Sequence, residues 1–400
     1  MSGTANRSRA SRARVVHVIT MLEWGGAQEN TLYSVEHLDP ERYDRVLVAG
    51  KGGMLDARAH RIPDLRVTLL EDLIREVHPA RDAKAFLALR AILREEKRTA
   101  GEVPLVVHTH SSKAGILGRA AARAAGADAI VHSIHGFGFH DGQSKPTHAL
   151  YVGLERLASR WTDSFVAVSE ENIRAGVKEG IFRRERCRLI RSGFDTASFL
   201  AGSRAAGRKL LGVPEGCPVV GTVAVFKPQK APLDFVETAR RVASEIPGSR
   251  FVMVGDGEMR GEVERAVAQA RMMDRFSFLG WRPEVPDLMA AFDVFLLTSR
   301  WEGLPKVVPQ ALIAGRPVVA TAVDGTREIV DSGVDGVLAS PGDIDALARG
   351  VSDILLGRLR LHATRKRDRL VREFDQDEMV RAQERLYAEI LAGKGFSGWS

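Results

Sequence analysis

The 400-residue chain has few of the features that mark secreted or membrane-spanning proteins. It holds only two cysteines, Cys187 and Cys217, which lie far apart and form no metal-ligand spacing. This argues against a disulfide framework or a structural zinc site, and it fits a reducing compartment. No apolar run approaches the roughly 18 residues of a spanning helix. The basic N-terminus lacks the apolar core of a signal peptide, so we expect a cytoplasmic protein with a disordered tail over residues 1–13.

Aromatic residues are also scarce, at 6%, whereas glycine is abundant with 38 residues. This composition suits an α/β protein with many short turns between strands and helices. The net charge of +7 has two readings, solubility or attraction to anionic lipid or a phosphorylated substrate. Because the basic residues are scattered and not interleaved with aromatic ones, we expect no nucleic-acid partner.

Short β-branched runs alternate with helical stretches along the chain. The first half holds seven runs, at 15–20, 45–49, 66–70, 105–109, 129–134, 164–168 and 188–190. Six more follow at 219–225, 250–254, 276–279, 294–297, 318–321 and 336–338. Such strand–helix repeats predict doubly wound, mainly parallel sheets.

We therefore expect an α/β protein with two Rossmann-like doubly wound domains that face an interdomain cleft. The predicted parts are an N-terminal domain over 14–194, a polar linker over 195–208, a C-terminal domain over 209–372, and a C-terminal helix within 373–400 that packs back toward the first domain. Ligands of open α/β sheets bind beyond the carboxyl ends of the strands. The segments that follow strands are thus the candidate functional ones.

In the first half, three such segments carry polar or glycine-rich sequences. Gly25 and Gly26 follow the first strand, where glycine lets the backbone approach a ligand and a helix start favours an anion. A tight turn explains these glycines equally well. Two later strand ends carry more histidine and lysine than a helix cap requires. The candidates there are His110, Lys113, His135 and Phe137.

In the second half, Lys227 and Lys230 follow a strand, and two lysines three positions apart can clamp a diphosphate. Gly255 stands in a strand-to-helix turn of low specificity. The most specific segment is TSRWEGLPKVVPQALIAGRPVVAT at 298–321, where the Glu302 carboxylate stands on a glycine-containing loop. Backbone N–H groups within residues 303–306, where only Pro305 lacks one, would face the group that Glu302 binds. This predicts an anion site beside a hydroxyl-binding acid, as a sugar diphosphate requires.

Two DxD triplets, at 343–345 and 375–377, have a carboxylate spacing that could hold a divalent metal. Both stand at predicted helix starts, where aspartate is a common cap. We interpret them as caps and expect no metal site.

Taken in order along residues 15–342, the segments resemble those of the group 1 glycosyltransferases of family 4. The segments that carry the resemblance are GGAQ at 25–28, HTHSSKAGILGR at 108–119, HGFGFH at 135–140, FKPQKAPLDF at 226–235, GDGE at 255–258, FLGW at 278–281 and the 298–321 segment. The likeness is greatest to members that build capsule, exopolysaccharide or lipid-linked glycans. It implies the two-domain GT-B architecture and a retaining, metal-independent transfer from a UDP- or GDP-linked sugar, without a cofactor.

The resemblance also implies roles for individual residues. His135 would lie beside the reactive face of the donor sugar, and Glu302 would accept hydrogen bonds from its hydroxyls; these two are the catalytic candidates. The implied donor- and nucleotide-binding residues are Gly25, Gly26, Lys227, Lys230, Gly255, Gly303, Leu304, Pro305 and Gln310. Gln310 stands where the family usually has a carboxylate, which leaves the identity of the nucleotide open. The acceptor-side candidates are His110, Lys113 and Phe137.

Basic stretches at 81–98 and 183–188 suit an anionic membrane surface, although they equally suit solvated helix faces. The resemblance favours a polyprenyl-diphosphate-linked glycan acceptor and a peripheral enzyme at the inner face of the cytoplasmic membrane. Two alternatives stay open: a nucleotide-sugar epimerase on the same architecture, and a non-catalytic protein that binds nucleotide sugars. An NAD-dependent dehydrogenase is the weakest alternative, because the dinucleotide glycine fingerprint is missing.

Overall fold

The computed structural model describes residues 12–139 and 143–399. Of the tail expected over residues 1–13, residues 1–11 lie outside this range. The chain divides into two compact units: residues 1–192 together with 376–400, and residues 193–375. None of the helices in the described part combines the length and apolar character that a bilayer crossing requires.

The first unit is built on a seven-stranded parallel sheet with the order β3-β2-β1-β4-β5-β6-β7. Its strands are β1 (Ala13–Met21), β2 (Tyr43–Gly50), β3 (Arg66–Leu70), β4 (Leu105–His110), β5 (Ala129–Ile134), β6 (Ser164–Ala167) and β7 (Cys187–Leu189). Its helices are α1 (Gly26–His37), α2 (Asp56–Ala59), α3 (Pro79–Ala100), α4 (Ser112–Ala125), α5 (Lys145–Ser159), α6 (Glu170–Lys178), the short η1 (Arg184–Arg186) and α16 (Gln376–Gly393).

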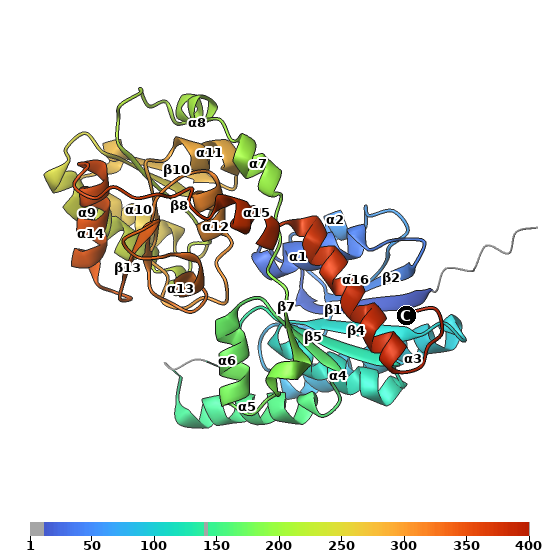
Figure 1. The fold of residues 1–400 in the computed structure, drawn as a ribbon. Helices are drawn as coiled ribbons and strands as arrows, with labels where there is room; N and C mark the ends of the chain where they lie inside the picture. Colours follow the sequence, from blue (N-terminus) through green and yellow to red (C-terminus); the bar gives the residue numbers. More distant parts are fainter. Residues whose placement is uncertain (1–11, 140–142, 400) are drawn as a thin grey trace, which may run out of the picture. The chain divides into compact units, whose positions relative to one another are not determined.

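Alternate residues of these strands pack on different helices, as the two-residue period of a strand requires. Val16 and Val18 of β1 lie in a core with Leu89 of α3 and Ala121 of α4. Val15 packs on the opposite face in a core shared with α16. Figure 1 shows α16, in red, lying across this sheet, against which its residues pack.

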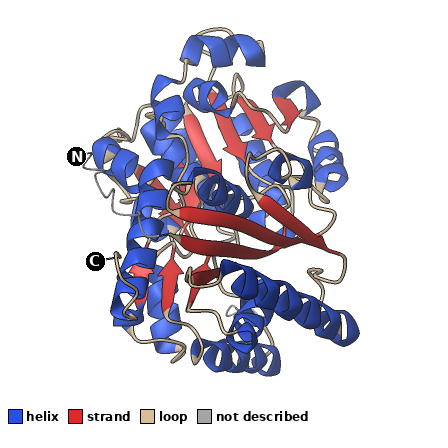
Figure 2. Cartoon of the chain, turned by 90° about the vertical axis from the view of Figure 1, so that its right-hand side faces the viewer, coloured by secondary structure: helices blue, strands red, loops and turns tan. Residues whose placement is uncertain are grey.

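The second unit is built on a six-stranded parallel sheet with the order β10-β9-β8-β11-β12-β13. Its strands are β8 (Val219–Val223), β9 (Arg250–Val254), β10 (Phe276–Gly280), β11 (Val294–Leu297), β12 (Val318–Thr321) and β13 (Gly336–Ala339). Its helices are α7 (Thr196–Ala201), α8 (Arg204–Leu211), η2 (Pro228–Lys230), α9 (Pro232–Glu245), α10 (Arg260–Gln269), η3 (Met273–Arg275), α11 (Val285–Ala291), α12 (Val307–Ile313), α13 (Thr326–Ile329), α14 (Ile344–Leu355) and α15 (Arg367–Glu373). Helices, blue in Figure 2, flank the red strands of both sheets. The predicted fold class, two doubly wound α/β domains, is thus confirmed.

The expected linker at 195–208 is corrected, because this stretch forms α7 and most of α8 within the second unit. Its polar residues are helix caps: the Asp195 side chain accepts a hydrogen bond from the Ser198 N–H, and Ser203 caps α8 in the same way. Its small residues allow close packing, since a Cβ on Gly207 would lie 2.0 Å from the carbonyl oxygen of Asp287 at α11. Capping residues together with small residues at helix contacts give a stretch the same polar, Gly- and Ser-containing composition as a flexible linker. Composition alone therefore predicted a linker where the chain forms two short helices.

Candidate active site

The order of strands reverses at one point in each sheet, between β1 and β4 in the first unit and between β8 and β11 in the second. Ligands of open α/β sheets bind at such switch points, beyond the carboxyl ends of the strands. The predicted residues follow these strands. Gly25 and Gly26 come after β1, Lys227 and Lys230 after β8, and Glu302 after β11.

In the second unit, Glu302 forms a buried ion pair with Lys230. The Glu302 Oε1 atom lies 2.5 Å from Lys230 Nζ and accepts a hydrogen bond of 2.5 Å from the Ser299 hydroxyl. The residue is 9% exposed. A carboxylate bonded on one oxygen by a cation and a hydroxyl is held in one orientation. The structure therefore brings together two residues that stand 72 positions apart and were assigned separately to the diphosphate and the sugar.

The loops that follow β8 and β11 are joined by further hydrogen bonds. The Arg300 N–H donates to the Gln229 carbonyl at 2.7 Å, and the Gln229 amide donates back to the Trp301 carbonyl at 2.9 Å. The Thr298 hydroxyl also donates to the Lys230 carbonyl. Since these bonds link both loop backbones, Lys230 and Glu302 are positioned by one rigid assembly.

Asp324 is a contributor that the sequence analysis missed. Its Oδ2 atom accepts a hydrogen bond of 2.6 Å from the backbone N–H of Glu302, and its backbone has a positive φ of 33°. Aspartate is one of the few non-glycine residues that tolerate this region. The available signal was its position after β12, which neighbours β11, but a helix cap explained that position as well.

The other predicted donor-side residues lie near this assembly or have structural explanations. Gly255 has a φ of +121°, and a Cβ there would lie 2.0 Å from the Ala224 carbonyl oxygen, so close packing alone requires the glycine. Leu304 is buried at the start of the segment leading to α12, and Gln310 is half-buried on that helix. Gly303 and Pro305 flank Leu304 in the same turn.

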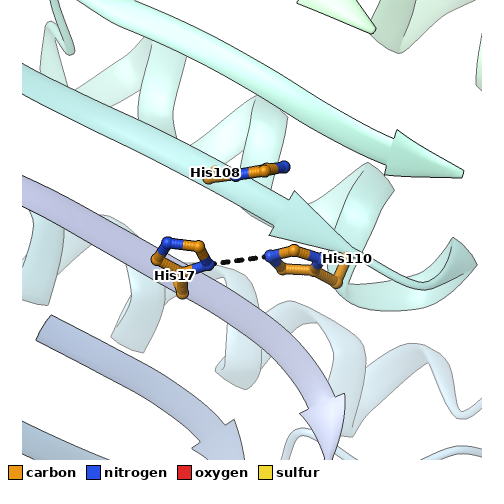
Figure 3. Close-up of side chains that lie close together, drawn as sticks. All are labelled: His17, His108 and His110. Atoms are coloured by element: carbon orange, nitrogen blue, oxygen red, sulfur yellow. Dashed lines mark hydrogen bonds between the residues drawn. The ribbon is translucent and has the colours of Figure 1, made fainter. Parts of the chain in front are cut away.

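In the first unit, histidines at the end of the sheet form a hydrogen-bonded chain. β1 and β4 pair in register with His17 beside His108. His17 Nδ1 lies 2.9 Å from His110 Nε2, and His110 Nδ1 lies 3.2 Å from His135 Nε2. Figure 3 shows the bond between His17 and His110, with His108 stacked above. At the inner end, the Tyr387 hydroxyl of α16 lies 2.5 Å from His108 Nδ1 and 3.5 Å from His17 Nε2.

Burial keeps the inner histidines neutral. Desolvation lowers the pKa of His17 to about 3, and it lowers the pKa values of His108 and His110 well below the ordinary value, with a smaller contribution from neighbouring histidines. A neutral imidazole has one donor and one acceptor nitrogen. The direction of one hydrogen bond therefore sets the direction of the next, and the Tyr387 hydroxyl is coupled to the tautomer of His135.

The same histidines could be considered as metal ligands, because nitrogens of His17, His108 and His110 lie within 4.8 Å of one another. The ring geometry argues against a shared ion. His108 and His110 stack with an interplanar angle of 29°, so their in-plane lone pairs do not converge. Both nitrogens of His110 bond other histidines, and those of His108 bond Tyr387 and Ser133. The arrangement fits a hydrogen-bonded chain.

One acceptor-side assignment, that of His110, needs correction, whereas that of Phe137 stays a prediction. His110 is 2% exposed and both its ring nitrogens are engaged, so it supports His135 and does not face an acceptor. Phe137 is partly buried and stacks on the buried Phe139 with 4.5 Å between ring centroids, because the loop folds onto the core below α5. Among the donor-side candidates, Gly25 has an extended φ of 176°, which any residue can adopt, so its backbone conformation does not require glycine.

Lys113, the remaining acceptor-side candidate, lines a pocket of about 420 Å³ that lies entirely within the first unit. Its Nζ atom pairs with Asp82 at 2.6 Å. The residues that line this pocket are Ile19, Thr20, Met21, Gln28, Arg75, Val77, Asp82, Ser111, Ser112, Lys113, Ile116, Leu117, Gly138, Tyr151 and Leu154. The volume is that of a site for a small molecule, for which about 300–1,000 Å³ is usual.

The DxD triplets have protein partners. Asp343 caps α14 by accepting a hydrogen bond from the Ala346 N–H, and Asp345 pairs with Arg241. Asp377 accepts a hydrogen bond from the hydroxyl of Tyr33. The interpretation of Asp343 as a cap is confirmed.

Comparisons with known proteins match both halves of the chain to glycosyltransferase families. The family described as "Glycosyltransferase Family 4" matches residues 24–198, and "Glycosyl transferases group 1" matches residues 217–356. The chain is 31% identical over 397 residues to UDP-Gal:alpha-D-GlcNAc-diphosphoundecaprenol alpha-1,3-galactosyltransferase of Escherichia coli, covering 97% of this chain and 100% of that one.

Solved structures resemble the fold over nearly the whole chain. Alr3699/HepE of Anabaena, in complex with UDP, is 23% identical with a TM-score of 0.74, and the match covers 95% of this chain and 100% of that one. The lipopolysaccharide outer core galactosyltransferase WaaB is 15% identical with a TM-score of 0.68, covering 94% and 99%. The chain belongs to the group 1 glycosyltransferases of family 4, and it is a sugar-transferring enzyme with the GT-B fold.

Proposed function

We propose that the chain is a retaining, metal-independent glycosyltransferase that moves a sugar from a UDP- or GDP-linked donor to a lipid-linked glycan acceptor in the synthesis of a surface polysaccharide. The observation that carries the donor half is the buried Lys230–Glu302 pair at the switch point of the second sheet. During transfer, the oxygen of an acceptor hydroxyl bonds the anomeric carbon while the bond from that carbon to the diphosphate oxygen breaks, and the hydroxyl proton passes to the leaving diphosphate. Negative charge then builds on the leaving diphosphate, where Lys230 and Lys227 would stabilise it.

The first unit supplies the acceptor half of the proposal. His135 would lie beside the reacting sugar, held through His110. The Escherichia coli relative is named for an acceptor linked to diphosphoundecaprenol, and the similarity spans both chains. The exposed side of α3 carries Lys84, Leu87 and Arg94, while Arg98 is paired there with the exposed Glu95. Two basic residues beside an apolar one suit an anionic membrane surface. This supports a peripheral location at the inner face of the cytoplasmic membrane.

One incubation separates the proposal from its rivals. The protein is mixed with UDP- and GDP-hexoses, with and without a lipid-linked sugar acceptor, and the products are followed by mass spectrometry and NMR. A transferase releases nucleoside diphosphate and forms a new glycosidic bond when acceptor is present, and anomeric coupling constants report retention. A new isomer of the donor without acceptor would identify an epimerase. Binding without turnover would identify a non-catalytic protein.

Chelation tests the role of metal ions. We propose that lysines neutralise the diphosphate, so transfer should proceed at an unchanged rate in excess EDTA, measured as release of nucleoside diphosphate. Loss of activity that magnesium or manganese restores would show that a divalent metal ion neutralises the diphosphate.

Removal of the Tyr387 hydroxyl tests the histidine chain. Tyr387→Phe should lower kcat about fivefold, the equivalent of ~1 kcal/mol for one lost buried hydrogen bond, because the tautomer of His135 is no longer biased. The ¹⁵N shifts of the histidine rings should change with it. Tyr43→Phe is the matched control, since Tyr43 lies in the same core with its ring 6.0 Å from that of Tyr387 but outside the chain. Equal effects of both substitutions would show that the hydrogen-bonded histidines contribute to core packing and not to catalysis.

A further inference from the structure

We propose that the pocket of the first unit binds the isoprenoid segment that adjoins the diphosphate of the acceptor. This rests on the proposed lipid-linked acceptor and names the part of the protein that recognises the lipid. The pocket is formed by residues of β1, α4 and α5 and by the segment that leads into α3. All of these lie in one compact unit, so the site is complete within it.

The walls of this pocket are mainly hydrocarbon. β1 contributes Ile19 and Met21, α4 contributes Ile116 and Leu117, and α5 contributes Leu154. A sugar placed against these five side chains would lose water from its hydroxyls without gaining hydrogen bonds from them, which costs free energy. A branched hydrocarbon chain instead gains from leaving water, in proportion to the apolar area buried. The walls therefore favour the lipid over the glycan.

Two cations line the same pocket where the segment before α3 meets the first turn of α4. Lys113 is paired with Asp82 at 2.6 Å, and Arg75 is paired with Glu23 while its side chain stays 61% exposed. Both cations line the pocket, and each is already paired with a carboxylate. The diphosphate of a ligand would therefore compete with Asp82 and Glu23 for them. Cation–carboxylate pairs beside apolar walls suit a ligand with an anionic head and a hydrocarbon chain, provided that the head takes the place of the carboxylates on the two cations.

The outer face of α5 gives the rest of a long lipid a route away from the pocket. Leu154 lines the pocket, while Leu150 and Leu157 on the same helix are 61% and 44% exposed. Within α5, all of whose residues are described, the single carboxylate is Glu155, which is buried and paired with Arg119. An exposed helix face with leucines and without acidic groups suits the boundary between lipid headgroups and acyl chains.

The test uses prenyl diphosphates without any sugar, because the acceptor glycan is not identified. Dimethylallyl, geranyl, farnesyl and geranylgeranyl diphosphates are titrated into the protein by calorimetry, below their critical micelle concentrations, with inorganic diphosphate as the reference. Affinity should rise from one isoprene unit to three by on the order of tenfold or more. Leu154→Trp, which fills the pocket, should abolish this rise and leave UDP affinity unchanged.

Two further variants keep the result interpretable. Ile116→Trp fills the pocket from α4 and should act like Leu154→Trp, in case either variant fails to fold. Val177→Trp adds an indole at an exposed position of α6 outside the pocket and should behave as wild type. If prenyl diphosphates bind no better than inorganic diphosphate, or if the filled pocket keeps the dependence on chain length, the assignment is overturned. Transfer to lipid-linked acceptors is measured separately, so its absence would refute the proposed function alone.

Discussion

Replacement of Glu302 by alanine is expected to lower kcat/KM by tens to thousands of fold, on the order of 2–4 kcal/mol for a lost preorganised polar contact. The carboxylate is buried and fixed by Ser299 and Lys230, so it needs no reorganisation to receive donor hydroxyls. Its removal also leaves the Lys230 ammonium, which is 16% exposed, without its partner. Both effects weaken the transition state relative to free enzyme and donor.

Two comparisons make this result specific. Glu302→Gln keeps a hydrogen-bond acceptor but removes the charge, so its activity should lie between those of wild type and the alanine variant. Asp345→Ala removes an exposed carboxylate that pairs with Arg241 and should leave turnover unchanged. Steady-state rates are measured alongside thermal unfolding for each variant. Turnover close to wild type in a folded Glu302→Ala protein would refute the assignment.

Most strands of this protein could be predicted from the sequence because they are short apolar runs, often β-branched, with turns or helices on either side. The expected runs at 66–70, 129–134, 250–254, 294–297 and 318–321 match β3, β5, β9, β11 and β12 at both ends. Lys230 and Glu302 could be singled out because each follows a strand, whereas Asp324 was missed although it follows β12. In contrast, the pairing of Lys230 with Glu302 depends on β8 lying beside β11, and strand order is a property of the folded sheet.

The histidine chain could be predicted from the sequence even less, because it joins segments that are far apart along the polypeptide. His17 lies in the interior of a strand, where a single histidine carries no functional pattern. Its neighbour Tyr387 stands 370 positions later, on the helix that closes the first unit. Two-residue spacing places His108 and His110 on one face of β4, where their rings stack, but that face is covered by α16 and not open to a substrate. Local periodicity gives the direction of a side chain, whereas burial is set by whichever distant segment packs against it.

Alanine at Lys230 is expected to weaken the binding of free nucleoside diphosphate by about 10- to 100-fold, the equivalent of ~1.5–3 kcal/mol for a hydrogen bond to a charged group. The proposed role of this ammonium is to bind the leaving diphosphate, which is present in the product as well as in the donor, so calorimetry with UDP and GDP measures it directly. Lys227→Ala should have the same direction of effect. Unchanged affinity in both variants would place the diphosphate clamp elsewhere.

The double variant Lys230→Ala/Glu302→Ala tests whether the two residues act as a unit. Because Lys230 Nζ lies 2.5 Å from the Glu302 carboxylate, each side chain fixes the orientation of the other. Once Glu302 is absent, the lysine is no longer held, and its removal should cost clearly less in kcat/KM than it does in the wild type. Contacting residues commonly show coupling of about 0.5–3 kcal/mol in such a cycle. Purely additive losses would mean that the lysine serves the diphosphate and the carboxylate serves the sugar independently, despite the ion pair that joins them.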